Sequence, residues 1–148
     1  MNYSLRCHQI FMPKKTRTII QKIIIPATPE QVYEAFIDPE KHSDFTNTNT
    51  TGSQDVGGEV SASDGYIAAR NIDLKKGKKI IQEWTTSEWP EGYPPSILEL
   101  DLKKVAEGTE LTMTHSKVPD EQADDYAEGW MEYYWNPMIE YFQAKKRS

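Results

Sequence analysis

The C-terminal segment Asp120–Phe142 predicts a long helix with an unusually broad apolar surface. At about 100° per residue, aromatic and other apolar side chains cover well over half of its circumference. One face holds Tyr126, Trp130, Tyr133, Tyr134, Pro137 and Tyr141, and the flank beside it holds Met131, Trp135, Met138 and Phe142. A surface helix normally buries a stripe of roughly 100°. The segment therefore predicts a helix that is covered on several sides, as it would be inside a curved sheet.

The residues before this helix predict the elements of such a sheet. The segment Thr18–Ile25 is rich in β-branched residues and ends at a proline, which is typical of a strand. Two short helices follow it. The first begins with Thr28 as its N-cap, Pro29 in its first turn and Gln31 completing a capping box. The second is predicted at Pro39–Phe45.

Several more strands are predicted between these helices and the C-terminal one. They lie at residues 46–53 (a short polar strand or a loop), 59–63, 66–74, 79–86, 97–105 and 111–115. Short turns containing glycine separate them, so successive strands are expected to pair in an antiparallel meander. The sequence thus predicts an α+β fold. In it, a curved antiparallel β-sheet of about six to seven strands wraps around a long C-terminal α-helix, and two short helices follow the first strand.

The chain length of 148 residues fits a single domain that can bury its own core. We expect that domain at residues 16–144. Residues 1–15 show no sustained period and are predicted to be a disordered tail. Its first part, up to Phe11, is either a mobile segment or an extension that precedes a start at Met12. Residues 145–148 are predicted to form a basic C-terminal tail.

Composition excludes several classes of function. A formal net charge of −6 disfavours binding to nucleic acid, which requires clustered Lys and Arg. No apolar run approaches the roughly 20 residues that span a bilayer, so membrane insertion is not expected. The single cysteine, Cys7, and three scattered histidines match no disulfide framework and no zinc site. We therefore expect a cytoplasmic protein without metal or cofactor, and no catalytic motif is present.

A cavity between the sheet and the long helix is the predicted binding site. The residues expected to line it are Tyr66, Arg70, Gln82, Trp84, Leu100, Met113, His115, Gly129, Trp130, Tyr133 and Pro137. His115 shares strand parity with Leu111 and Met113, which places it on the inner face. It is either a buried histidine bonded to backbone or a contact for a ligand.

Two further polar residues on the strands leave alternatives open. Arg70 shares parity with Tyr66, and it is either an inward charge paired with a carboxylate such as Glu83 or turned outward by a bulge. Gln82 lies between Ile80 and Trp84 on one face, as a pocket amide or opposite a polar gap near the sheet edge.

Two helix positions resist an explanation from packing alone. A glycine within a helix costs about 1 kcal/mol relative to alanine, so Gly129 indicates either a closely packed strand or room for a ligand. Pro137 removes the hydrogen bond to the carbonyl of Tyr133 and is expected to kink the helix. Such a kink would let the helix follow a curved sheet, and it would make a natural gate for a cavity.

The chain resembles a known superfamily. The stretch from Ile25 to Phe36, followed by Asp38-Pro39, resembles the opening of the START-like helix-grip superfamily. More narrowly, the chain resembles the C-terminal domain of the activator of the ninety-kilodalton heat-shock protein ATPase. That likeness is carried by Gly65-Tyr66-Ile67, Ile81-Gln82-Glu83-Trp84, Glu88-Trp89-Pro90, Gly108-Thr109-Glu110-Leu111-Thr112, His115-Ser116-Lys117-Val118-Pro119 and Gly129-Trp130. The resemblance implies a curved sheet around a C-terminal helix, often with a hydrophobic cavity. The full-length activator has a further N-terminal domain that grips the chaperone, so we do not expect this chain alone to activate one.

Three functional hypotheses follow. The first is a non-enzymatic, stress-related module that binds a small hydrophobic ligand, most simply as a monomer. The second is a co-chaperone-like regulator that contacts a heat-shock chaperone through its surface. The third is a cyclase-like or hydrolase-like enzyme that uses His115 or Arg70 within the pocket.

Overall fold

A computed structural model describes residues 14–147 of the chain. Its elements, in chain order, are β1 (Thr16–Ile25), α2 (Pro29–Ile37), α3 (Pro39–Thr46), β2 (Thr51–Gly52), β3 (Glu59–Ala62), β4 (Ile67–Lys75), β5 (Lys79–Thr86), β6 (Ser96–Val105), β7 (Gly108–Pro119), α4 (Asp120–Trp130), the π-helical turn η1 (Met131–Trp135) and α5 (Asn136–Arg147). The predicted N-terminal tail and the alternative start at Met12 fall almost entirely outside the described residues.

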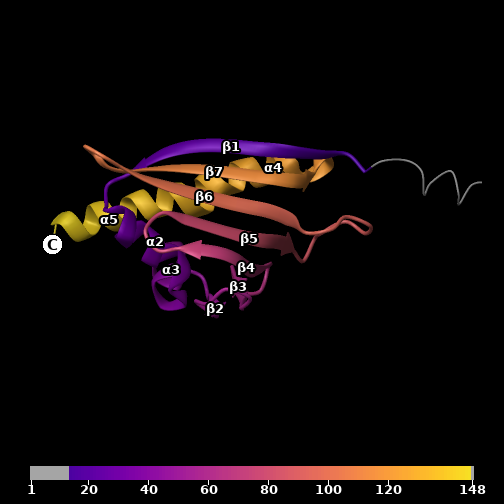
Figure 1. Cartoon of the computed structure of the whole chain (residues 1–148), viewed down its shortest axis with the longest axis horizontal. Coiled ribbons are helices and arrows are strands. Elements are labelled where there is room, and N and C mark those ends of the chain that lie inside the picture. Colours follow the sequence, from indigo (N-terminus) through magenta and orange to yellow (C-terminus); the bar gives the residue numbers. More distant parts are fainter. Residues whose placement is uncertain (1–13, 148) are drawn as a thin grey trace, which may run out of the picture.

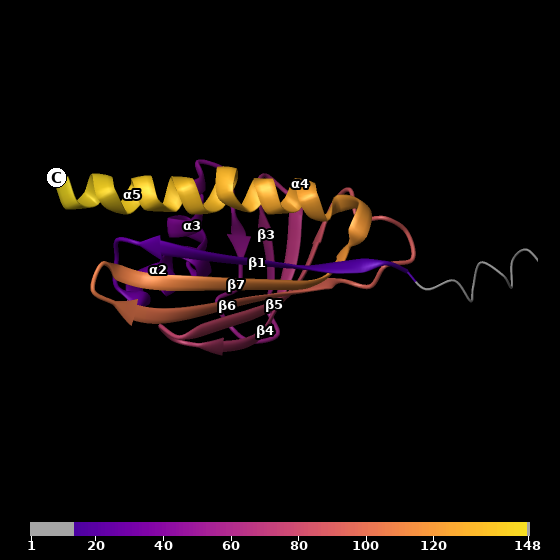
Figure 2. The ribbon, with the colours of Figure 1, turned by 90° about the horizontal axis from the view of Figure 1, so that it is seen from above.

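The strands form one seven-stranded sheet in the order β1-β7-β6-β5-β4-β3-β2, with every pair antiparallel. β1 and β2 therefore lie at opposite edges, and the helices α2 and α3 carry the chain from one edge to the other. The long helix formed by α4, η1 and α5 lies across one face of the sheet (Figures 1 and 2). This is the predicted arrangement of a curved antiparallel sheet around a C-terminal helix.

The two short helices form where their capping residues predict them. Thr28 Oγ1 accepts a hydrogen bond from the Gln31 N–H at 3.2 Å, and Gln31 Oε1 accepts one from the Thr28 N–H at 2.9 Å. The predicted capping box is confirmed. Asp38 ends α2 and caps α3 by accepting from the Glu40 N–H at 2.9 Å. Asn47, in the left-handed conformation at φ 57°, ends α3, so only Thr51–Gly52 remains of the polar strand expected at 46–53.

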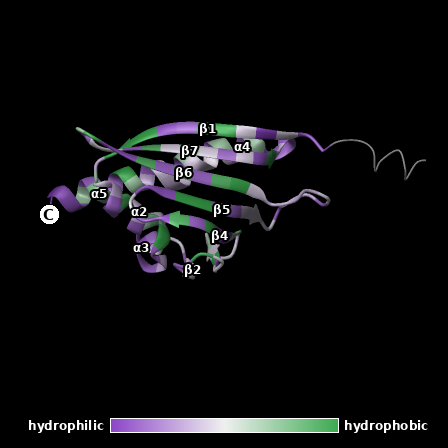
Figure 3. Ribbon diagram, viewed as in Figure 1, coloured by the Kyte–Doolittle hydropathy of each residue, from purple (hydrophilic) through white to green (hydrophobic). Residues whose placement is uncertain are grey.

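Alternation along the central strands places the core where it was expected. Leu98, Leu100 and Leu102 of β6 and Leu111 and Met113 of β7 are all buried against the helix side of the sheet. Figure 3 shows hydrophobic and hydrophilic residues alternating along the long strands. The concave face of the sheet therefore supplies the apolar surface that the long helix covers.

The inward face of β4 differs from the prediction. Ile67, Ala69 and Asn71 are buried, whereas Ala68 and Arg70 are exposed, so the residues sharing parity with Arg70 point away from the core. Both faces of this strand carry apolar residues, and alternation alone cannot choose between them. The turn before the strand determines which of its faces points to the core. In that turn, three successive residues from Ser63 have positive φ. A bulge between Asn71 and Asp73 then shifts the rest of the strand.

A π-helical turn interrupts the long helix at the point where a proline kink was predicted. The Asn136 N–H bonds to the Met131 carbonyl, five residues earlier. This geometry brings Trp130 and Trp135, also five residues apart, into a stacked contact with ring centroids 5.3 Å apart. Pro137 instead lies just after a locally widened turn of the helix. α4 and α5 form one continuous helix on either side of that turn (Figure 2).

The widened turn decides which aromatic side chains are buried. Trp135 is 0% exposed, and its Nε1–H donates to Gln21 Oε1 of the edge strand β1 at 2.9 Å. Tyr133, expected on the buried face, is 63% exposed. The second aromatic flank of the helix is therefore a core element packed on β1.

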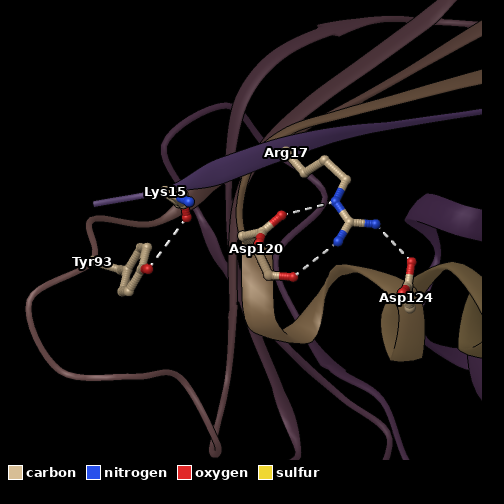
Figure 4. Close-up of polar contacts among 5 residues, drawn as sticks. All are labelled: Lys15, Arg17, Tyr93, Asp120 and Asp124. Atoms are coloured by element: carbon tan, nitrogen blue, oxygen red, sulfur yellow. Dashed lines mark hydrogen bonds and ion pairs between the residues drawn. The ribbon is translucent and has the colours of Figure 1, made fainter. Parts of the chain in front are cut away.

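Ion pairs fasten the start of the helix to β1. Arg17 donates from Nε to Asp120 Oδ1 at 3.0 Å and from Nη1 to Asp124 Oδ1 at 2.6 Å (Figure 4). The Lys15 carbonyl accepts from the Asp120 N–H at 3.0 Å and from the Tyr93 hydroxyl at 3.2 Å. At the other end, the basic residues that were expected in a tail form the last turn of α5, where cations favour the helix dipole.

Candidate functional site

A cavity of about 380 Å³ lies between the long helix and the β3–β5 half of the sheet. Its lining residues are Thr46, Thr48, Ser63, Tyr66, Ile67, Trp84, Tyr126, Gly129, Trp130, Glu132, Tyr133, Tyr134 and Pro137. Trp84 and Ile67 belong to the sheet, and the residues from Tyr126 onward belong to the helix. Glu132 and Tyr133 are exposed, so the cavity opens to solvent beside the π-helical turn. Its volume lies within the range of sites that bind small molecules.

Three tyrosines of the lining have already committed their hydroxyl protons. Tyr66 donates to Glu88 Oε1 at 2.6 Å, and Tyr126 donates to Gln122 Oε1 at 3.0 Å. Tyr134 donates to the Nε2 of His42 at 2.8 Å, because the Nδ1–H of that ring donates to a backbone carbonyl. Burial raises the pKa of the Tyr126 and Tyr134 phenols. All three hydroxyls are therefore neutral donors to protein groups, and none of them can donate to a ligand.

His115 lies behind the wall of the cavity, and both of its ring nitrogens are hydrogen-bonded to protein groups. The Trp130 Nε1–H donates to its Nδ1 at 3.1 Å, because an indole nitrogen can only donate. The His115 Nε2–H therefore donates to Ser96 Oγ at 2.8 Å, and that hydroxyl donates to the Trp84 carbonyl at 2.8 Å. Burial lowers the pKa of His115 to about 3, so the ring is neutral.

This chain of bonds bears on the enzymatic hypothesis. A Ser-His pair at 2.8 Å would be a candidate nucleophile and base if the histidine could accept the serine proton. Here the nitrogen that faces Ser96 carries a proton, and the other nitrogen is occupied by Trp130. The pair therefore holds strands β5, β6 and β7 against the helix. His115 is buried, as one of the two hypotheses predicted, but it hydrogen-bonds to side chains and not to the backbone.

The cavity contains only part of the predicted set. Of the predicted residues, the lining contains Tyr66, Trp84, Gly129, Trp130, Tyr133 and Pro137. Leu100 and Met113 are fully buried core residues, 1% and 0% exposed, beneath the helix. Arg70 points outward and pairs with Glu83, its Nη2 donating to Oε1 at 2.7 Å. The prediction that Arg70 lines the cavity is wrong. The residues of β4 that face the core are Ile67, Ala69 and Asn71, and Arg70 lies on the opposite face of the strand.

Gln82 is buried but does not reach the cavity. Its Nε2 donates to Asn71 Oδ1 at 2.8 Å, and the Asn71 amide donates to the carbonyls of Ser53 and Asp55 at 3.1 Å each. These bonds anchor the loop between β2 and β3 to the sheet. Gln82 is therefore not a pocket amide, and it does not face a polar gap near the edge, because β5 is the middle strand and its amide bonds directly to Asn71.

Gly129 has room for a small side chain. A Cβ atom at this position would meet no atom closer than a ring carbon of Tyr133 at 3.7 Å, which is an ordinary van der Waals distance. No strand packs closely against it, so the packing explanation for this glycine is wrong. The remaining explanation is the space itself, since Gly129 borders the cavity.

Several lining residues escaped prediction. Tyr126 and Tyr134 lie on the helix face that the sequence identified, so helical periodicity could have added them. Thr46, Thr48 and Ser63 come from the end of α3 and from two turns, whose positions depend on tertiary contacts. No local pattern marks residues of that kind.

The described residues show no sign of a metal centre or of a membrane span. Within residues 14–147, no group of three or more His, Cys, Asp or Glu residues is placed to hold a metal ion. No helix in this part of the chain is long and apolar enough to cross a membrane.

The antiparallel sheet, the long C-terminal helix and the cavity between them define a helix-grip domain of the START-like class. A solved Hsp90 activator from Plasmodium falciparum superposes with a TM-score of 0.70 at 21% identity, covering 80% of this chain and 89% of that one. A protein from Mesorhizobium loti superposes with a TM-score of 0.71 at 18% identity, covering 86% and 98%.

The family can be stated more narrowly. Residues 26–143 match the family model described as activator of Hsp90 ATPase homolog 1-like protein, and the chain belongs to that family. The human activator of 90 kDa heat shock protein ATPase homolog 1 is 30% identical over 115 residues, covering 78% of this chain and 34% of the human protein. The Dictyostelium discoideum homologue is 26% identical over 118 residues, covering 78% and 30%. The chain thus spans about a third of the length of these curated relatives.

Proposed function

We propose that this chain is a non-enzymatic START-like binding domain that takes a small hydrophobic ligand in the cavity between the sheet and the C-terminal helix. The observation that carries the proposal is the cavity of about 380 Å³, whose lining includes six aromatic residues and a helix glycine against which no strand packs closely. Such a cavity buries the apolar surface of a small molecule, which is the main source of affinity for ligands of this kind.

A matched pair of substitutions at Gly129 tests this proposal. Gly129→Leu extends a side chain into the cavity, and we expect it to weaken binding of the neutral fluorescent probe N-phenyl-1-naphthylamine at least about tenfold. Gly129→Ala adds only a methyl group at ordinary contact distance. It should keep the affinity for the probe within about twofold and raise the stability by about 0.5–1 kcal/mol, because alanine favours the helix.

Fluorescence titration measures the affinity, and thermal unfolding of each variant measures stability. If Gly129→Leu bound the probe as tightly as the unchanged protein, the cavity would not be the site. If the unchanged protein failed to bind the probe up to its solubility limit, the hydrophobic-ligand proposal would fall.

Family membership favours a second candidate, a co-chaperone-like regulator that contacts a heat-shock chaperone through its surface. The relatives that share its domain are named as activators of the 90 kDa heat shock protein ATPase. Amide chemical-shift mapping with a purified 90 kDa chaperone tests the contact, with serum albumin as the control protein. We expect a contiguous set of shifted or broadened amide signals with the chaperone alone. No perturbation at about 100 µM chaperone, where weak transient contacts are still detected, would remove this candidate.

A further inference from the structure

The lining of the cavity is aromatic and acidic, without a basic group. Six aromatic side chains border it: Tyr66, Trp84, Tyr126, Trp130, Tyr133 and Tyr134. Glu132 is its one charged residue, and none of the lining residues, all within the described part of the chain, is Lys, Arg or His. Aromatic rings carry negative charge on their faces and attract cations, and a carboxylate at the mouth acts in the same direction.

The aromatic rings are arranged so that the lining is not a single flat surface. Trp84 and Tyr126 are nearly perpendicular, at 84° with centroids 5.2 Å apart, and Trp84 and Trp130 are tilted by 36° at 5.6 Å. Trp130 and Tyr134 meet at 55° with centroids 4.7 Å apart. The rings therefore pack on one another as one continuous aromatic wall, and a cation that lies against this wall is attracted by the ring faces that border the cavity.

The hydrogen bonds of the lining add negative potential. Tyr66 donates to the carboxylate of Glu88, which makes its phenol more electron-rich. The hydroxyl protons of Tyr126 and Tyr134 are committed to protein acceptors, so neither hydroxyl can donate to a ligand. A ligand that carries a carboxylate or phosphate would find no positive group and few free donors here.

The π-helical turn leaves one backbone carbonyl of the helix without its usual donor. In a helix, the Glu132 carbonyl could accept from the N–H of Asn136 or of residue 137. The Asn136 N–H goes to the Met131 carbonyl, and Pro137 has no N–H. The Glu132 carbonyl therefore lacks its helical donor.

We infer that the ligand of this cavity is a hydrophobic organic cation, such as an alkyl- or arylammonium compound. The six rings take the cation and its apolar substituents, and Glu132 balances its charge at the mouth. The net charge of −6 favours the approach of such a ligand. This inference rests on the proposed function and narrows it to one chemical class.

Two probes of the same shape test the charge requirement. Phenyltrimethylammonium and tert-butylbenzene differ in a nitrogen cation against a carbon atom, and each can be titrated against bound N-phenyl-1-naphthylamine. We expect the cation to displace that probe at a concentration about tenfold lower than its neutral counterpart, by cation–π attraction and the nearby carboxylate. Equal or better displacement by tert-butylbenzene would overturn the inference while leaving the cavity a hydrophobic site. Failure of the protein to bind N-phenyl-1-naphthylamine at all would instead remove the proposed function itself.

A pair of surface substitutions locates the charge effect. Glu132→Gln should weaken phenyltrimethylammonium binding about threefold to tenfold and leave tert-butylbenzene binding unchanged. Glu128→Gln, one helical turn earlier, exposed and outside the lining, is the matched control and should change neither affinity by more than about twofold. An equal loss for both ligands in Glu132→Gln, or an equal loss of cation binding in the two variants, would contradict the role assigned to Glu132.

Discussion

Trp135→Ala is expected to lower the free energy of unfolding by about 4 kcal/mol, which corresponds to a fall in Tm of about 10 °C for a domain of this size. The side chain is 0% exposed and stacks on Trp130 with the rings 13° from parallel. Its removal leaves a large cavity and deprives Gln21 Oε1 of the indole donor. Urea unfolding followed by circular dichroism at pH 7.5 measures the change. If Trp135→Ala is too unstable to purify, Trp135→Phe should show a smaller loss of about 2 kcal/mol.

Tyr133→Ala is the matched control for this prediction. The side chain is aromatic, lies two residues earlier in the same turn and is 63% exposed. We expect its removal to cost less than about 1 kcal/mol. In a regular α-helix with the buried face indicated by its sequence, Tyr133 would be buried and Trp135 would lie at the margin. A larger loss for Tyr133→Ala than for Trp135→Ala would therefore contradict the π-helical turn.

The sequence predicts that the helix is interrupted at this point, but it does not predict that the interruption is a π-helical turn. Pro137 predicts that the hydrogen-bond ladder is interrupted near Tyr133, and it is. The interruption is resolved by a widened turn because that turn lets Trp130 and Trp135 both reach the core. Which resolution is best depends on the space between the sheet and the helix, and local propensity carries no information about that space.

Elements governed by local rules were predictable, and those governed by tertiary contacts were not. The strand at 79–86 and the capping box of Thr28 and Gln31 follow from alternation and from helix-start chemistry, and both are present. The face of β4 was predicted wrongly because apolar residues lie on both sides of it, so the preceding turn decides. The same distinction applies to the residues that line the cavity. The helix periodicity identifies its aromatic wall, whereas the threonines and the serine at its rim are brought there by the fold.

The stability of the domain should fall strongly between pH 7.5 and pH 5. His42 is 3% exposed and His115 is 0% exposed, and burial lowers their pKa values from 6.5 to about 4 and about 3. Between those values and 6.5, the unfolded chain binds protons that the folded protein excludes. Stability therefore rises with pH in this window, is complete above about pH 7, and is lost as the pH falls towards the folded-state values. Each histidine accounts for about 2 kcal/mol at pH 5, so the loss from both is about 4 kcal/mol.

The surroundings of the two rings explain why neither accepts a proton. The Nε2 of His42 is the acceptor for the Tyr134 hydroxyl, and the Nδ1 of His115 is the acceptor for the Trp130 indole. Protonation of either nitrogen would point its new N–H at the hydroxyl or indole donor that it now accepts from, in a site that is buried from water. The ring of His42 lies among the rings of Phe36, Phe45 and Tyr134, and both of its nitrogens bond to uncharged groups, which do not balance the charge of an imidazolium.

Urea denaturation at pH 7.5, 6.5, 5.5 and 5.0 measures the expected slope, and the single variant His42→Gln separates the two contributions. It should be less stable at every pH, since Tyr134 loses its imidazole acceptor, and its stability should fall by only about 2 kcal/mol over the same range. An imidazole titration by NMR provides a second measurement that does not depend on a variant folding. The His115 ring signals should stay unchanged down to pH 5, with the Nε2 proton in place. A midpoint near 6.5 for that ring, or a free energy of unfolding that is constant from pH 7.5 to 5, would contradict the buried neutral histidines on which the wall of the cavity rests.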